Sequence, residues 1–197
     1  MTAPRIRPLP SDSEAVQAVG PLAARGAKGI GFMSTVLHNQ NLYDVWRPLA
    51  RYLNASTTLT LRDREIVILR TAWLSHSQYE WGNHALVVAT GNVLSDQEML
   101  GIRLGSSAPN WTPAEAALIA ATEEYKASSA ISEATWQTLS DTYSDEQLVE
   151  LLVLIGFYWL IAFFASSVQI DLEEGLPSMY DYRALLTGVD HSDPASA

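Results

Sequence analysis

Residues 60–90, TLRDREIVILRTAWLSHSQYEWGNHALVVAT, decide the fold. Apolar residues such as Ile66, Leu69 and Trp73 recur three or four positions apart, which is the spacing of one face of an α-helix. Ser77 marks the start of a second helix, because a hydroxyl residue followed three positions later by glutamate is an N-terminal helix signal. The stretch therefore predicts two consecutive helices joined by a short turn.

The other boundary signals in the chain are also those of helices. Ser95, Thr112 and Ser144 are each followed three residues later by glutamate or glutamine, the pattern of a reciprocal capping box. Alternating strand patterns bounded by hairpin turns are missing. We therefore predict an all-α fold of eight or nine helices, with Pro48 kinking or breaking the third. The predicted helices cover about residues 12–25, 31–38, 40–54, 60–74, 77–90, 95–104, 112–128, 132–142 and 145–168.

The composition limits the classes of function. With 197 residues and 48% hydrophobic side chains, the chain can bury one well-packed core. Its 12 Lys and Arg against 22 Asp and Glu give a formal net charge of −10, which repels nucleic acid and anionic lipid. With no cysteine, it forms no disulfide, thiolate metal site or thiol redox cycle. Any catalysis must use oxygen and nitrogen groups.

Two stretches bear on location and domain organisation. Residues 1–13 lack an apolar segment of signal-peptide length, which predicts a cytoplasmic protein. Residues 151–168 carry no ionised side chain and approach the ~18 residues that span a membrane. Acidic residues flank both ends, so we expect a helix buried all round, in the core or a subunit interface, and no membrane partner. We expect one domain over residues 1–174, followed by an arm and frayed tail over 175–197.

Three ionisable residues of the helical pair form a candidate acid–base set. Glu80 and His84 are four positions apart and share one helix face. Glu65 lies nineteen positions before His84, and a helical hairpin would return it to the same pocket. In this interpretation His84 transfers a proton near its ordinary pKa of ~6.5, Glu80 orients it, and Glu65 is a relay or second acid–base group.

Each of these residues also has a structural explanation. Glu80 completes the capping-box pattern with Ser77 and could simply hold a helix end. His84 could be an ordinary core histidine, and Glu65 a first-turn charge favoured by the helix dipole. The spacing by itself leaves these alternatives open.

The order of these motifs resembles the carboxymuconolactone decarboxylase family, which includes the alkylhydroperoxidase D-like proteins. The resemblance rests on Arg64-Glu65 before an apolar helix, on Tyr79-Glu80-Trp81-x-x-His84, and on Gly91 before the Ser95 cap, over about residues 35–105. It implies an all-helical subunit that acts on a small molecule and assembles into a homo-oligomer, a dimer, trimer or hexamer, with active sites near subunit contacts.

The resemblance breaks where the peroxidase branch of that family has a Cys-x-x-Cys-x-x-x-His motif. When the histidine is aligned on His84, Ser77 and Glu80 stand at the two cysteine positions, and Glu65 at the family's upstream glutamate. Without thiols, the peroxidase chemistry cannot carry over. What remains resembles the decarboxylase branch, in which a small carboxylated lactone loses carbon dioxide and the dienolate is protonated without a metal or organic cofactor.

Several residues near the acid–base set are candidates for substrate binding. Arg64 or Arg70 could hold a substrate carboxylate with two hydrogen bonds. Tyr79 and Trp81 would form the pocket wall, and Ser77 is included because of its aligned position.

Two other functions stay open. His76, Glu80 and His84 recur every fourth residue and would line one face for a metal ion if a single helix ran unbroken from His76. The second is a non-catalytic oligomeric scaffold or small-molecule binding protein of the same fold, because a fold does not determine a function.

Overall fold

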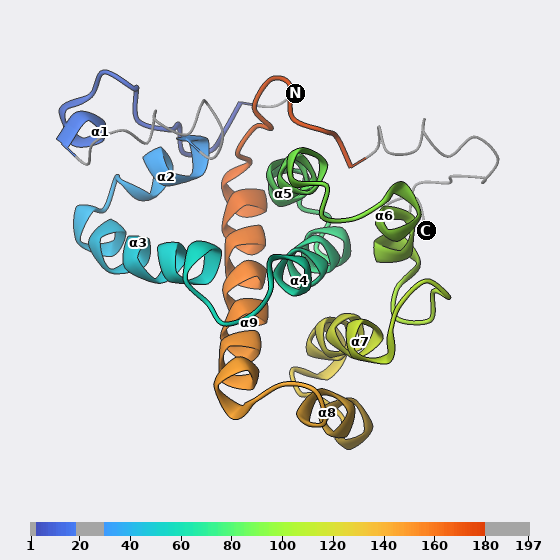
Figure 1. The fold of residues 1–197 in the computed structure, drawn as a ribbon. Helices are drawn as coiled ribbons and strands as arrows, with labels where there is room; N and C mark the ends of the chain where they lie inside the picture. The colour runs from blue at the N-terminus through green and yellow to red at the C-terminus, as the bar shows by residue number, and fades with distance from the viewer. Residues whose placement is uncertain (1–2, 19–29, 180–197) are drawn as a thin grey trace.

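The computed structural model describes residues 3–18 and 30–179, and within these ranges all regular structure is helical. The all-α prediction is confirmed. Figure 1 shows the arrangement of the helices. They are α1 (Glu14–Ala18), α2 (Ile30–Val36), α3 (Gln40–Ala55), α4 (Leu61–Leu74), α5 (Gln78–Gly91), α6 (Asp96–Leu104), α7 (Pro113–Ser128), α8 (Glu133–Ser140) and α9 (Asp145–Val168).

The predicted boundaries agree closely with the observed helices from α2 onward. Two predictions need correction. The first helix was expected over residues 12–25, whereas α1 covers Glu14–Ala18 and residues 19–29 lie outside the described part of the chain. Of the kink or break expected at Pro48, the break is not observed, because the 16-residue α3 runs on through the proline, with Tyr43 buried before it and Leu53 after it. A proline removes only one backbone hydrogen bond, and this anchored helix tolerates that loss.

Helix caps form as the sequence indicates, with one difference at α5. Ser95, Thr112 and Ser144 each close a reciprocal capping box with the residue three positions later. Ser77 accepts a hydrogen bond from the backbone N–H of Glu80, but the return bond is not made. The N–H of Ser77 donates instead to the carbonyl of Ala72, at 2.9 Å. The Glu80 carboxylate is therefore free to point elsewhere.

Helix α4 lies at the centre of the fold and packs against α5, α6, α7 and α9. Helix α9 runs the length of the molecule, with α1, α2 and α3 on one side of it and α6, α7 and α8 on the other (Figure 1). Among the described residues it is the one helix long and apolar enough to cross a membrane, and 56% of its most apolar window is buried inside the protein. It is a core helix, as predicted.

Helix α9 is not buried all round, however. Its outer face exposes a line of apolar side chains, of which Phe163 is the most exposed, at 75%. The others are Val149, Leu152, Val153 and Leu160.

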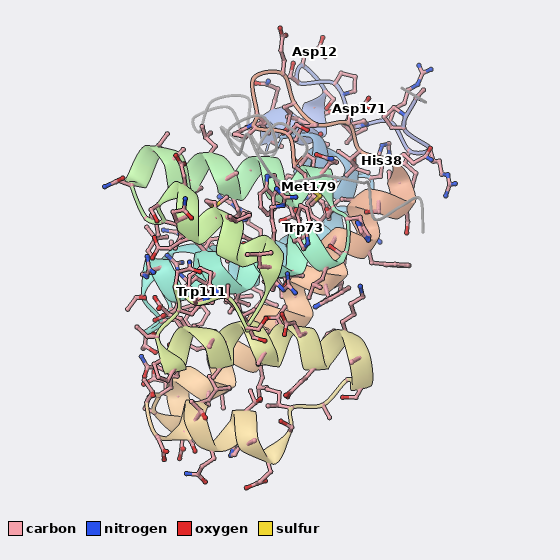
Figure 2. All side chains as sticks on the ribbon, turned by 90° about the vertical axis from the view of Figure 1, so that its right-hand side faces the viewer. Asp12, His38, Trp73, Trp111, Asp171 and Met179 are labelled. Carbon is pink, nitrogen blue, oxygen red and sulfur yellow. The ribbon has the colours of Figure 1, made fainter. Side chains whose placement is uncertain are left out.

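The N-terminal segment lies against the C-terminal end of α9. The backbone N–H of Arg5 donates to the carbonyl of Val168, at 2.8 Å. Figure 2 shows Asp12, His38 and Asp171 at this same end, opposite α7 and α8. After α9 the chain turns back, and the N–H of Met179 donates to the side chain of Gln78 at the start of α5, at 3.0 Å. The predicted arm thus begins on its own subunit, while residues 180–197 lie outside the described ranges and the boundary at residue 174 stays a prediction.

Candidate functional site

The hairpin of α4 and α5 brings the three predicted acid–base residues together. Glu65 lies on the second turn of α4, and Glu80 and His84 lie on successive turns of α5. All three are buried, with 3%, 5% and 8% of their surfaces exposed. The turn between the helices is tight because His76 takes a left-handed conformation, with φ of 54°. Three titratable groups in a dry site are unusual, since burial is costly for charges that lack partners.

The distances divide the roles of the two glutamates. The Nδ1 atom of His84 lies 2.8 Å from Oε2 of Glu65, a hydrogen bond. Its Nε2 atom lies 3.8 Å from Oε2 of Glu80, which is beyond hydrogen-bond length. The hydrogen bond to Glu65 therefore fixes the orientation of the imidazole, and the Glu80 carboxylate lies beside the other ring nitrogen. The sequence favoured Glu80 for the orienting contact, because helix spacing cannot show which carboxylate lies closer.

The pKa values of the site follow from its burial and its charges. Burial by itself would lower the pKa of His84, but the charge and hydrogen bond of Glu65, together with the charge of Glu80, outweigh it and raise that pKa. Burial raises the pKa of Glu80 to about 7, with the charges of Glu173 and Glu65 adding to the rise and His84 opposing it. Glu80 can thus both hold and release a proton near neutral pH.

Tyr158 of α9 forms a wall of the site that the sequence did not reveal. Its ring packs edge-on against His84, with ring centroids 5.1 Å apart. Its hydroxyl donates to the side chain of Asn54 of α3, at 2.9 Å. Burial, and then the charges of Glu80 and Glu65, raise its pKa well above the ordinary value, so it stays a neutral donor. Within an apolar run, Tyr158 carried no signal that separated it from core residues.

The two candidate arginines have different surroundings. Arg70 is buried and donates to the carbonyls of Ile102 and Arg103 and to the carboxylate of Glu123. It links α4, α6 and α7 and is not brought to the acid–base set. Arg64 is half-buried, and one of its nitrogens donates to the carbonyl of Leu53, at 3.1 Å.

Arg64 is the better placed of the two to bind an anion. Its buried Nε atom has no hydrogen-bond partner, and within residues 3–18 and 30–179 it forms no ion pair with a carboxylate. Its charge lowers the pKa of His84, against the larger raising effect of Glu65, so it acts on the same site.

The remaining predicted binding residues lie at the start of α5, and their side chains have different surroundings. Trp81 is fully buried and packs against Trp73, with ring centroids 5.7 Å apart, so it belongs to the core and not to an open pocket wall. Ser77 is buried as the cap of α5. The hydroxyl of Tyr79 accepts from the N–H of Phe32 and donates to Glu173, both at 3.1 Å.

The geometry of the turn removes the alternative metal set. Helix α5 begins at Gln78, and His76 lies before it as an exposed residue in the turn. His76 therefore does not share a face with Glu80 and His84. In the described part of the chain, no group of three or more His, Asp or Glu side chains is placed to hold a metal ion.

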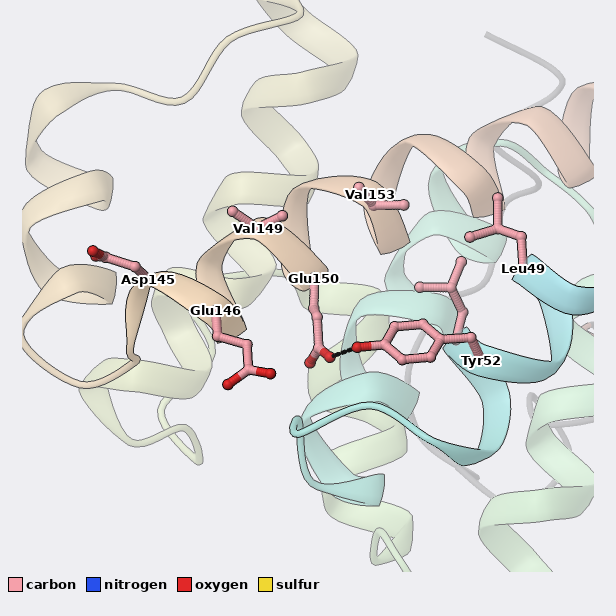
Figure 3. Close-up of a pocket in the computed structure, with 8 residues that line it drawn as sticks. Leu49, Tyr52, Asp145, Glu146, Val149, Glu150 and Val153 are labelled. Atoms are coloured by element: carbon pink, nitrogen blue, oxygen red, sulfur yellow. Dashed lines mark hydrogen bonds between the residues drawn. The ribbon is translucent and has the colours of Figure 1, made fainter.

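A surface cavity of about 460 Å³ lies between α3 and α9, apart from the acid–base set (Figure 3). Glu150 beneath it is buried and accepts hydrogen bonds from the Tyr52 hydroxyl and from the backbone and side chain of Thr58. These bonds satisfy the carboxylate within the fold and join α9 to the end of α3. We assign Glu150 a structural role. The cavity is lined by Leu49, Tyr52, Leu53, Asp145, Glu146, Val149, Glu150 and Val153.

Comparison with known families bears directly on the α3 to α7 region. Residues 40–124 match the carboxymuconolactone decarboxylase family. The resemblance inferred from the motifs is confirmed, and all three acid–base residues lie within the matched region. No curated protein matches the sequence significantly.

Solved structures show the same fold at low sequence identity. The alkylhydroperoxidase AhpD core of a peroxidase-related protein from Ralstonia eutropha has a TM-score of 0.69 at 15% identity, over 88% of this chain and 95% of its own. A peroxidase-related protein from Silicibacter has a TM-score of 0.64 at 14% identity, over 74% and 78% of the two chains.

The debrominase Bmp8, as a cysteine-to-alanine variant with 2,3,4-tribromopyrrole, has a TM-score of 0.72 at 14% identity, over 91% of this chain and 94% of its own. At such identities the likeness concerns the fold. The AhpD-like architecture of this cysteine-free chain is therefore established, and its chemistry has to be argued from its own residues.

Proposed function

We propose that this protein is a cofactor-independent acid–base enzyme that decarboxylates, or transfers a proton on, a small carboxylated or lactone-type substrate. The observation that carries the proposal is the buried set in which His84 is hydrogen-bonded to Glu65 through Nδ1 and faces Glu80 through Nε2. A carboxylate that orients an imidazole, with a second titratable group at the other ring nitrogen, is an arrangement suited to general acid–base catalysis.

In a decarboxylation, the bond between the substrate carbon and its carboxylate breaks and carbon dioxide leaves. The electron pair moves into the conjugated carbonyl system as a dienolate. His84 then gives its Nε2 proton to the carbon, and Glu80 returns a proton to Nε2. Water finally restores the proton to Glu80, so that each turnover consumes one proton and releases one carbon dioxide.

Arg64 supports the carboxylated class of substrate. Its guanidinium combines one protein carbonyl partner with a buried nitrogen that lacks a partner. A substrate carboxylate would satisfy that donor with a charge-assisted hydrogen bond. A small ring compound also agrees with the tribromopyrrole bound by the debrominase of the same fold.

The alternative of a non-catalytic scaffold of this fold receives less support. A histidine with a purely structural role would have its ring nitrogens satisfied by backbone groups, whereas both nitrogens of His84 face carboxylates. We also propose a homo-oligomer, with the exposed apolar face of α9 as the surface available for a subunit contact.

The test is carbon dioxide release from a panel of small carboxylated lactones. We expect His84→Ala to reduce turnover on the substrate found by roughly 10² to 10⁴-fold, the usual contribution of a positioned acid–base group. His76→Asn is the matched control, because His76 is exposed and asparagine tolerates its left-handed backbone. Full activity of His84→Ala would refute the assignment.

A further inference from the structure

The segment after α9 is built against the start of α5. A Cβ added at Gly82 would lie 3.1 Å from the carbonyl oxygen of Pro177 and 3.2 Å from the Cβ of Leu176, so glycine lets the two segments pack closely here. Met179 adds the hydrogen bond to Gln78. Residues 170–179 are therefore a fixed strap along the first turns of α5, the part of the helix that carries Glu80.

The strap brings a third carboxylate, Glu173, to this region. Its Oε1 atom accepts the hydroxyl of Tyr79 at 3.1 Å and the N–H of Gly31 of α2 at 3.2 Å. Its Oε2 atom is buried and has no hydrogen-bond partner. No cation pairs with it among the residues that the structure describes. The groups that hold this carboxylate are neutral donors, and a charge inside a protein is screened less than one in water.

The position of Glu173 concerns Glu80 in particular. Tyr79, which Glu173 holds, is the residue directly before Glu80 on the helix. The charge of Glu173 is also one of the causes, after burial, that raise the pKa of Glu80.

The groups facing Glu80 come from four parts of the fold. Helix α4 contributes Glu65, α5 contributes Tyr79 and His84, α9 contributes Tyr158, and the strap contributes Glu173. The charge of Arg64 acts on His84 and Tyr158. Of the carboxylates facing Glu80, Glu65 is engaged by His84, whereas Glu173 has no cationic partner in the described residues.

We propose that Glu173 is a positioning residue of the acid–base site, whose unpaired charge, held in place through Tyr79, keeps a proton on Glu80 at neutral pH. The part of this inference that concerns catalysis rests on the proposed function, whereas the effect of Glu173 on Glu80 does not. The protonation of Glu80 can be measured without a substrate.

The experiment compares Glu173→Gln with Glu174→Gln in the full chain. Glutamine keeps an oxygen to accept from Tyr79 and Gly31 but removes the charge, while Glu174 is the exposed neighbour. The titration of Glu80 is followed by NMR of ¹³C-labelled glutamate carboxyls, assigned with a Glu80→Gln variant. We expect Glu173→Gln to move the Glu80 midpoint down by roughly one pH unit. Glu174→Gln should leave the Glu80 midpoint in place. Glu173→Asp, which keeps the charge, should have a midpoint close to that of the wild type.

The outcomes separate the two proposals. An unchanged Glu80 midpoint in a folded Glu173→Gln protein overturns the role of Glu173 and leaves the proposed function standing. If Glu173→Gln does not fold, Glu173→Asn and Glu173→Asp, which have the same size and differ in charge, are compared instead. A lower Glu80 midpoint in Glu173→Asn than in Glu173→Asp supports the role, and equal midpoints overturn it. A shifted midpoint supports the role even if every lactone acid fails as a substrate, a result that would refute only the proposed function. With a substrate, the alkaline limb of the pH profile should move down by the same amount as the midpoint.

Discussion

The first turns of α5 and α6 place a glutamate at the same helical position, the third residue after a serine cap, yet the two glutamates have opposite properties. Glu98 of α6 accepts from the backbone and hydroxyl of Ser95 and pairs with Arg62. The hydrogen bond from Arg62 is the main reason that its pKa falls to about 2. Glu80 of α5 makes no return bond to its cap. Its carboxyl is buried, and burial together with the charges of Glu173 and Glu65 raises its pKa to about 7. One sequence pattern thus yields a structural anion in one place and a proton-exchanging group in the other.

The difference comes from the neighbours that the fold supplies. Arg62 of α4 reaches Glu98, and it also pairs with Glu115 of α7 at 2.6 Å. Glu65, three residues after Arg62 on α4, contacts His84 of α5. Helix propensity and capping are similar at the two starts, so the tertiary contacts decide which glutamate is available for chemistry.

The largest expected difference between the glutamates at the starts of α5 and α6 is in their effect on turnover. Glu80→Gln keeps the size of the side chain but cannot exchange a proton, so we expect a loss on the order of 10²-fold. Glu98→Gln, the matched change at α6, should stay within about twofold of the wild type because it lies outside the acid–base set. Steady-state kinetics on the substrate found above measures both. Equal losses in the two variants would contradict the comparison.

The next effect is on the pH dependence of stability, to which Glu80 and Glu98 contribute with opposite signs. The folded pKa of Glu80 lies above its unfolded value. Its contribution to the free energy of unfolding is therefore complete below about pH 4.5 and is lost as the pH rises through about 7. We expect this loss to reach about 2 to 3 kcal/mol, shared with the coupled titration of His84. The folded pKa of Glu98 lies below its unfolded value, so its contribution to the stability of the fold is present above about pH 4.5 and is lost as the pH falls toward about 2.

Urea unfolding between pH 3 and 8 measures these two contributions. Relative to the wild type, Glu80→Gln should gain stability as the pH rises from 4.5 to 8. Glu98→Gln should lose stability from pH 3 to 5, by less than about 1 kcal/mol because solvent reaches the half-buried Glu98–Arg62 pair and screens it. The same pH trend in both variants would show that the two glutamates do not differ as described.

The smallest effect is on the caps themselves. Ser95→Ala removes a closed box, whereas Ser77→Ala removes a single long bond, of 3.4 Å, to the N–H of Glu80. We expect a loss of about 1 kcal/mol for Ser95→Ala and less for Ser77→Ala. Thermal or chemical unfolding at pH 7 tests the ranking. A larger loss at Ser77 would mean that α5 depends on its cap as much as α6 does.

Local signals in the sequence were sufficient for most of the fold. Capping pairs such as Ser95 with Glu98 specify helix starts within a few residues, because both partners lie on one turn. The return of Glu65 to His84 also followed from a short hairpin. Tyr158 could not be singled out, since a tyrosine in an apolar helix has the same pattern whether it lines a site or fills a core. Glu173 likewise carries no local pattern, and only the course of the strap brings it to α5.

The sequence by itself determined the all-helical class, the helix boundaries from α2 onward and the absence of thiols, and it predicted the three candidate acid–base residues, because composition, capping and helix periodicity act over a few neighbouring positions. Only the tertiary structure decided that Glu65 and not Glu80 is hydrogen-bonded to His84, and that Arg70 pairs with Glu123 whereas Arg64 has no ion pair within the described residues. It also placed Tyr158 and Glu173 beside the site. These choices depend on ångström distances and on charges from distant segments, and the spacing of residues along a chain does not contain them.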